Sequence, residues 1–174
     1  AVLGPIYLGS GASGAGFVTG VAVLAAGYFA FPRNGQVELR RVAYALAASV
    51  VTYSLLFTFV APSFQRIWIS PRIALAFQAN KPCPNSRLAS AGFGEPSLVF
   101  LTDTETQLTG VQGVVDHLLA DPACAVGIAP MRDAKAMQDE IEAGGRSLSQ
   151  IAEIGGINYS NGNDLSLRMY RIAP

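Results

Sequence analysis

Residues 40–64 read RRVAYALAASVVTYSLLFTFVAPSF, and this stretch decides the fold class. No Asp, Glu, Lys or Arg occurs between Val42 and Gln65, and most positions in this interval are apolar. About 20 apolar residues in a helix cross the hydrocarbon layer of a membrane, because each residue adds ~1.5 Å to the helix length. We therefore predict a transmembrane helix at about residues 42–62.

A second uncharged stretch precedes it, because no acidic or basic residue lies between Ala1 and Pro32. Its most apolar part predicts a helix at about residues 14–32. A secretory signal peptide is the alternative, but such a peptide has a basic start and a small-residue cleavage site. This stretch has no basic start and ends in Phe-Ala-Phe-Pro, so we favour a second membrane helix.

The loop between the two predicted helices, residues 33–41, is basic. It contains Arg33, Arg40 and Arg41, and short loops rich in Lys and Arg stay on the cytoplasmic side of bacterial membranes. We therefore expect residues 1–64 to form a transmembrane hairpin with a cytoplasmic loop. Residues 65–174 would then form a domain on the outer side of the membrane.

The two cysteines of the chain agree with this topology. Cys83 and Cys124 both lie in the part expected outside, where disulfides persist. A bond between them would close a loop of about 40 residues and stabilise the fold by ~3–4 kcal/mol in the chain-entropy model. Two unrelated buried thiols are the alternative, and we favour the disulfide.

The residues directly after the second helix form a segment expected next to the membrane, and the sequence pattern beyond it predicts a small α/β domain. Arg66, Trp68 and Arg72 are candidates for contact with lipid headgroups, because basic and tryptophan side chains favour the interface. Ser70-Pro71 predicts a helix start with Ser70 as the N-cap, and Thr109 is a second expected cap. The further elements that the pattern predicts are strands at 88–93, 97–101 and 124–129, helices at 111–120 and 131–143, and a hairpin of 148–160 with 165–172.

The predicted fold is therefore a pair of membrane helices followed by an α/β domain with a mixed sheet. The 97–101 run, Ser-Leu-Val-Phe-Leu, is continuously apolar, as expected of a strand buried on both faces. Asn161-Gly162-Asn163 separates the last two strands, and Asn-Gly is a strong signal for an antiparallel hairpin.

The residues give no sign of an active site in this segment. His117 is the single histidine, and one histidine cannot assemble a metal site. The carboxylates fall in expected loops and on the polar face of a helix, where solvated charge is the usual state. We therefore predict no catalytic residue, no cofactor and no metal in this segment, and the zero net charge gives no indication of nucleic-acid binding.

A glycine motif near the N-terminus has a simple explanation. Gly9–Gly14 fits G-x-G-x-x-G, but the dinucleotide fingerprint follows a strand and needs an acidic residue about 20 positions later. No acidic residue precedes Glu38. Ala12, Gly16 and Gly20 instead recur at four-residue spacing, which lets membrane helices approach closely.

Three stretches of sequence resemble a known family. They are Ile67–Ala74 directly after the second helix, Ala89–Phe93 with Glu95–Leu101, and Gly156–Gly162 before the final strand. They are similar to the C-terminal part of bacterial polytopic glycosyltransferases of the dolichyl-phosphate-mannose mannosyltransferase and lipid A aminoarabinose transferase type, which have the GT-C architecture. The resemblance runs from about residue 33 to the C-terminus.

The resemblance implies that the chain is the end of a larger enzyme of the bacterial inner membrane, with residues 65–174 as its periplasmic domain. Such an enzyme moves a sugar from a polyprenyl-phosphate donor to a periplasmic acceptor. The general base of such enzymes lies in their first periplasmic loop, so the catalytic residues would lie outside this segment. A divalent metal is known for some members, and no matching ligand set occurs here. The alternative is a self-contained membrane-anchored module that binds or scaffolds a partner without enzymatic activity.

Overall fold

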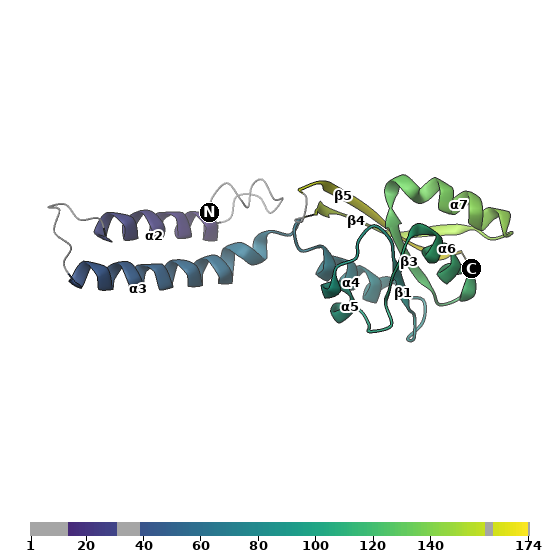
Figure 1. Cartoon of the computed structure of the whole chain (residues 1–174), viewed down its shortest axis with the longest axis horizontal. Coiled ribbons are helices and arrows are strands. Elements are labelled where there is room, and N and C mark those ends of the chain that lie inside the picture. The colour runs from purple at the N-terminus through teal and green to yellow at the C-terminus, as the bar shows by residue number, and fades with distance from the viewer. Residues whose placement is uncertain (1–13, 31–38, 159–161, 174) are drawn as a thin grey trace. The chain divides into compact units, whose positions relative to one another are not determined.

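The computed structural model describes residues 14–30, 39–158 and 162–173. The chain divides into two compact units, Ala1–Arg66 and Ile67–Pro174. Each unit has its own internal packing and is described separately. Figure 1 shows the elements of both units.

The first unit is helical and contains one long apolar helix. Helix α2 spans Gly14–Ala30, and helix α3 spans Leu39–Leu55 and continues through a π-helical turn at Leu56–Val60 and a 3₁₀ turn at Ala61–Ser63. The continuous helix Leu39–Ser63 has 25 residues. At ~1.5 Å per residue it is roughly 37 Å long, which exceeds the ~30 Å hydrocarbon layer.

The predicted helix at 42–62 is therefore confirmed as a helix of membrane-spanning length, and it begins three residues earlier than expected. The helix predicted at 14–32 is also apolar, but α2 has 17 residues and is shorter than a typical span. Among the described residues, Leu39–Ser63 alone meets the length and composition of a membrane span. The predicted cytoplasmic loop, apart from Leu39, Arg40 and Arg41, lies outside the described residues.

Small residues form the contact between α2 and α3. The half-buried positions of α3 include Ala45, Ala48 and Thr52, which recur at helical spacing. On α2, Ala26 and Gly27 face Ala45 and Ala48 across the space between the helices, whereas Gly16, which is buried, and Gly20, which is half-buried, are not among these residues. Ala12 and the rest of the G-x-G-x-x-G motif before Gly14 lie outside the described residues.

The second unit is an α/β domain built on one five-stranded mixed sheet. Its strands are β1 (Leu88–Ser90), β2 (Gln107–Leu108), β3 (Val126–Pro130), β4 (Leu148–Ile157) and β5 (Asp164–Ile172), in the order β2-β1-β3-β5-β4. Strand β1 is parallel to β2 and to β3, whereas β5 is antiparallel to β3 and β4. The predicted mixed sheet with an antiparallel C-terminal pair is confirmed.

Helices cover both faces of the sheet. Helices α4 (Ile69–Asn80) and α5 (Pro96–Leu101) pack on one face, and α6 (Val111–Ala120) and α7 (Ala134–Ala143) pack on the other (Figure 1). Each face of the sheet has its own hydrophobic core, and β5 contributes to both. Leu167 and Met169 belong to the core with α4, whereas Tyr170 and Ile172 belong to the core with α6 and α7. The domain is therefore a three-layer α/β/α structure.

One predicted strand is wrong. The run 97–101 forms helix α5, which begins with Pro96 at its first position. Proline is favourable there because its missing N–H group needs no partner in the first helical turn. Leu98 is the buried residue of α5, and Phe100 is exposed. A short apolar run fits a buried strand and a helix equally well, and here the preceding proline decides for the helix.

Two expected helix caps are also wrong. Helix α4 begins at Ile69, and Ser70 lies inside its first turn, where its side chain bonds to α5 instead of capping. Helix α6 is preceded by Gly110, without a side-chain cap, so Thr109 is not its N-cap. Strand β2 was not predicted, because two residues carry no detectable periodicity.

The predicted disulfide is confirmed. Cys83, which follows α4, is bonded to Cys124, which precedes β3, and the two Cα atoms are 5.3 Å apart. The bond joins the layer that contains α4 to the end of α6. Such a bond is consistent with an oxidising compartment outside the cytoplasm.

Candidate functional site

One cavity of the second unit lies at the start of α4. A cavity of about 390 Å³ is lined by Ile67, Trp68, Ile69, Ser70, Pro71 and Glu95. Its wall is mostly apolar, and one carboxylate and one buried hydroxyl supply the polar groups. An apolar pocket with a few polar groups is the common form of a small-ligand site.

The polar groups of this cavity are hydrogen-bonded to one another. The Ser70 and Ser97 hydroxyl oxygens are 2.8 Å apart. Both hydroxyls also lie near the Glu95 Oε2 atom, at 3.4 Å for Ser70 and 3.3 Å for Ser97. Glu95 directly precedes α5, so this cluster joins the first turn of α4 to the first turn of α5. Both hydrogen bonds use Oε2, which leaves Oε1 of Glu95 as an acceptor for a ligand.

The three residues predicted at the lipid interface occupy different environments. Trp68 lines the cavity and is half-exposed. Arg72 lies on α4 and donates a hydrogen bond from Nη1 to the backbone oxygen of Gly155 on β4. Arg66 is the last residue of the first unit and is half-buried. The structure therefore brings Trp68 to the cavity and gives Arg72 a role in holding α4 against the sheet.

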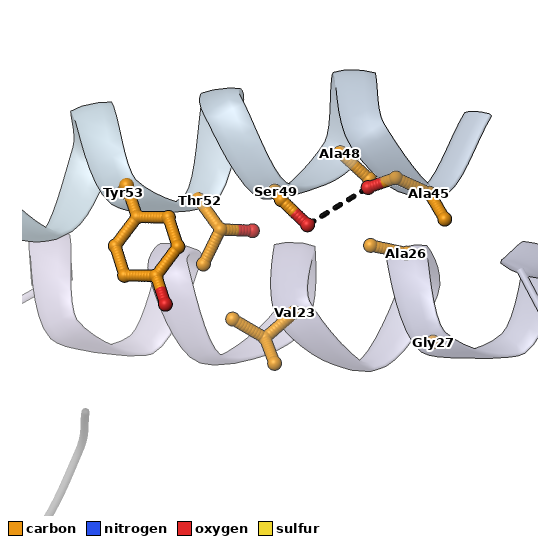
Figure 2. A pocket seen from close by; sticks show the side chains of 8 residues that line it. All are labelled: Val23, Ala26, Gly27, Ala45, Ala48, Ser49, Thr52 and Tyr53. Carbon is orange, nitrogen blue, oxygen red and sulfur yellow. Dashed lines mark hydrogen bonds between the residues drawn. The ribbon is translucent and has the colours of Figure 1, made fainter. Parts of the chain in front are cut away.

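A second cavity lies within the helical unit, between α2 and α3. It has a volume of about 300 Å³, and Figure 2 shows that side chains of both helices line it. Ser49 donates to the backbone oxygen of Ala45 at 2.8 Å, which satisfies its hydroxyl within its own helix. The remaining lining is small or apolar, apart from Thr52 and Tyr53. This cavity follows from packing small residues between two helices and carries no reactive group.

A third cavity, of about 230 Å³, lies where β1 and β3 end. Gly92, Pro130, Met131, Arg132, Asp164, Leu165 and Ser166 line it. The carboxyl ends of parallel strands are a frequent place for ligands in α/β domains. Here β3 pairs with the parallel strand β1 on one side and with the antiparallel strand β5 on the other. Arg132 and Asp164 are the charged residues of the lining.

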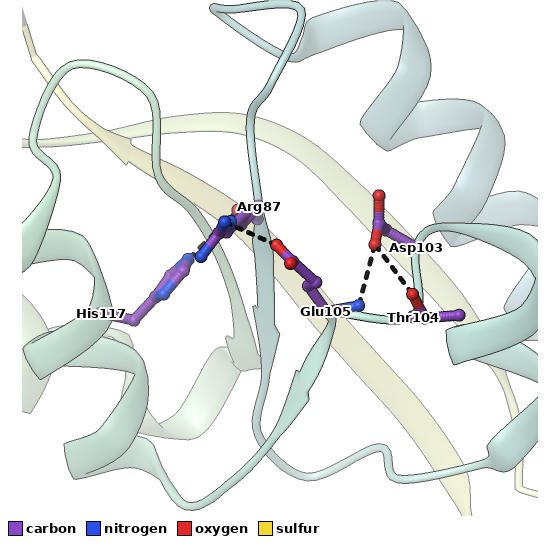
Figure 3. Close-up of polar contacts among 5 residues, drawn as sticks. All are labelled: Arg87, Asp103, Thr104, Glu105 and His117. Carbon is purple, nitrogen blue, oxygen red and sulfur yellow. Dashed lines mark hydrogen bonds and ion pairs between the residues drawn. The ribbon is translucent and has the colours of Figure 1, made fainter.

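His117 and its surroundings have a structural explanation. The His117 Nε2 atom is 3.1 Å from the backbone oxygen of Arg87, and the Arg87 guanidinium forms an ion pair with Glu105 at 2.7 Å (Figure 3). Asp103 accepts a hydrogen bond from the backbone N–H of Glu105 at 2.8 Å. The Arg87–Glu105 pair is mostly exposed, where such pairs contribute little to stability. These contacts fix the loop before β2.

The described residues contain no group of three or more His, Cys, Asp or Glu side chains that could hold a metal ion. The six residues lining the cavity at α4 include no histidine, lysine or cysteine. This cavity can therefore bind a ligand through its apolar wall and through hydrogen bonds to Glu95.

The chain matches no family model, no curated protein and no solved structure.

Glu95 is the functional candidate that sequence reasoning missed. It stands before Pro96 in a loop, and nothing local marks it as a site residue. Its importance depends on Ser70, 25 positions earlier in the chain, and the single sequence holds no signal for that contact.

Proposed function

We propose that this chain is the C-terminal part of an inner-membrane glycosyltransferase that transfers a sugar from a polyprenyl-phosphate donor to a periplasmic acceptor. The observation that supports it is the order of parts at the junction. An apolar helix of membrane-spanning length, Leu39–Ser63, is followed within six residues by the Trp-Ile-Ser-Pro-Arg stretch at 68–72 and then by a disulfide-bonded α/β domain.

On this proposal the catalytic residues lie elsewhere in a longer protein. Helix α2 supplies a second, short membrane segment beside the helix Leu39–Ser63. The α/β domain stands in the periplasm, where its disulfide forms, and it helps the acceptor to reach the membrane-embedded chemistry. The cavity with Trp68 and Glu95 is the part of this domain that is suited to bind an acceptor group. A divalent metal, if the full enzyme uses one, would have its ligands outside this segment.

The topology can be tested with alkaline phosphatase fusions, since this enzyme folds only outside the cytoplasm. A fusion after Pro174 is expected to be active, and a fusion after Gly35 is expected to be inactive. A protein released from the membrane by cleavage after residue 63 would instead show that Leu39–Ser63 is a signal sequence.

The activity can be tested in membrane vesicles that contain the full gene product. Deletion of residues 67–174 is expected to abolish sugar transfer from a labelled polyprenyl-phosphate sugar, while the protein remains in the membrane. The Glu95→Gln variant is expected to weaken acceptor saturation with little change in donor saturation. Unchanged transfer by the deletion variant would contradict a role for this domain in the reaction.

A membrane-anchored module that binds or scaffolds a partner is the second candidate. It is favoured by one observation, the combination of a defined cavity with the lack of a metal cluster among the described residues. Two results together would support it. The full gene product would show no sugar-transfer activity, and the domain isolated from cells would carry one bound partner in stoichiometric amount.

A further inference from the structure

Large apolar side chains are exposed on the layer formed by α4 and α5. Phe100 has 85% of its surface exposed and Leu75 has 71%, while Trp68 and Leu101 each have 47%. Leu75 lies on the outer face of α4, because the inner face of that helix is formed by Ile73 and Phe77. Exposed apolar residues that gather on one layer of a domain mark an interaction surface.

The two parts of the sequence that form these layers differ in net charge. Residues 63–101, which include α4 and α5, contain four basic residues and one acidic residue. Residues 102–174, which include α6 and α7, contain five basic and ten acidic residues. The net charge is therefore +3 for the first segment and −5 for the second. Arg66 lies outside the domain and Arg87 is paired with Glu105, so the basic residues on or beside α4 are Arg72 and Lys81. The α4–α5 layer is therefore less acidic than the layer with α7, which carries Asp139, Glu140 and Glu142.

The chain between the apolar helix and α4 is short. Five residues lie between Ser63 and Ile69, so the two ends of this stretch are at most about 20 Å apart when it is fully extended. The hydrogen bond between Ser70 and Ser97 then fixes the first turn of α5 beside the first turn of α4. Phe100 follows Ser97 within one helical turn, so it also lies near the point where the domain is attached.

We propose that the outer face of α4 and α5, with Phe100, Leu75, Leu101 and Trp68, is inserted into the lipid–water interface of the membrane. The proposal rests on the part of the proposed function in which Leu39–Ser63 spans that membrane. The apolar side chains enter the boundary between headgroups and acyl chains, as they do in amphipathic interfacial helices, and the basic residues Arg72 and Lys81 on and beside α4 favour anionic lipids. The acidic layer with α7 then faces the aqueous periplasm.

Tryptophan fluorescence in proteoliposomes tests this surface directly, because Trp68 is the single tryptophan of the chain. The full chain carrying Trp68→Phe is given one new tryptophan and reconstituted into vesicles of phosphatidylcholine and phosphatidylglycerol with brominated acyl chains, which quench nearby indoles. Phe100→Trp and Leu75→Trp probe the proposed surface. Leu119→Trp, on α6, is the matched control, since Leu119 is also apolar and 36% exposed.

Phe100→Trp and Leu75→Trp are expected to lose about half of their emission relative to vesicles without bromine, since interfacial side chains lie ~5–10 Å into the boundary. Leu119→Trp is expected to change little. Equal quenching at positions 100 and 119 would overturn the proposal. An emission at position 100 that is blue-shifted but not quenched would overturn it too, and would indicate a protein partner on this face.

A fourth variant tests separately whether the helix Leu39–Ser63 spans the bilayer. Val50→Trp lies in the helix Leu39–Ser63, where its side chain is exposed in the isolated chain. Strong quenching at position 50 without quenching at positions 75 and 100 refutes the interfacial surface alone. No quenching at position 50 shows that the helix does not span the bilayer, and both proposals then fail.

Discussion

The hydroxyl oxygens of Ser70 and Ser97 lie 2.8 Å apart, although the residues are 27 positions apart in the chain. This contact connects α4 to α5 at their first turns and places Glu95 beside both hydroxyls. Ser70 is buried and Ser97 is exposed, so the pair runs from the core of the domain to its surface. The two side chains therefore hold the first turn of α4 beside the first turn of α5.

Loss of either hydroxyl should therefore destabilise the domain. Ser70→Ala and Ser97→Ala are each expected to lower the free energy of unfolding by about 1 kcal/mol, the usual net value of such a hydrogen bond. The double variant should lose less than the sum, because both substitutions remove the same contact. Urea unfolding of the full chain in detergent micelles measures all three.

Ser147→Ala is the control for this series, since Ser147 is exposed in the turn before β4 and should change stability by less than about 0.5 kcal/mol. Strictly additive losses at Ser70 and Ser97 would mean that the two hydroxyls stabilise the domain independently.

The disulfide should be a major source of stability. Replacing both Cys83 and Cys124 by serine opens a loop with a sequence separation of 41 residues. The chain-entropy model gives a loss of about 4 kcal/mol for a loop of that size. The same urea experiment checks this value, with dithiothreitol-treated wild type as a comparison that leaves the sequence unchanged. A loss below about 1 kcal/mol in both samples would show that the bond contributes little.

Gly92 should be intolerant of a side chain. Its φ angle is +74°, and a Cβ atom built there would overlap the ring of Pro130. Gly92→Ala is therefore expected to lower stability by ~1–3 kcal/mol, from backbone strain and from the overlap. Gly94→Ala is the matched control two positions away, because a Cβ atom there meets no heavy atom within 4 Å. Similar melting temperatures for the two variants would contradict this reading.

Tyr170 should make the stability of the domain sensitive to alkaline pH. Burial raises the pKa of the Tyr170 hydroxyl above its ordinary value of 10.0, and the nearby charge of Arg168 partly opposes this. Because the folded pKa is higher, the unfolded chain loses this proton first as the pH rises. The contribution of Tyr170 is therefore fully present below about pH 10 and is lost as the pH increases through the folded pKa.

The Tyr170→Phe variant checks this dependence. Among the described residues the Tyr170 hydroxyl has no hydrogen-bond partner, so its removal should leave stability at pH 7 unchanged or raise it by up to about 1 kcal/mol. Between pH 9 and pH 11 the stability difference in favour of the variant should increase. A constant difference over this range would show that the hydroxyl is solvated in the folded state.

The elements with long periodic patterns could be predicted from the sequence. The helix at Leu39–Ser63, α6, α7 and the final pair of strands each carry enough apolar residues at a regular spacing to define their type. The strand predicted at 97–101 failed because five apolar residues in a row have no periodicity, and Pro96 decided the outcome. Strand β2 depends on pairing with β1, which is a property of the folded sheet.

The candidate site could be predicted only in part. Trp68 follows a long apolar stretch and was therefore predicted at the lipid interface, but its place in the cavity was not predicted. Glu95 and Ser97 were not recognised as site residues, since their roles arise from contacts with residues 25 and 27 positions away. The exposed position of Phe100 was missed for the same reason as α5, because a strand buried on both faces would have hidden it.

The position of the disulfide also determines how the domain would respond to mechanical tension. A load applied through the helix Leu39–Ser63 enters α4 at Ile69 and reaches Cys83 after α4. From Cys83 the force passes through the sulfur atoms to Cys124 and into β3, so it bypasses residues 84–123. Helix α4 could then be peeled away while β1, β2, α5 and α6 remain in an unloaded closed loop. When force is applied between the helix Leu39–Ser63 and β3, the disulfide prevents residues 84–123 from being extended, so it limits how far the chain can lengthen.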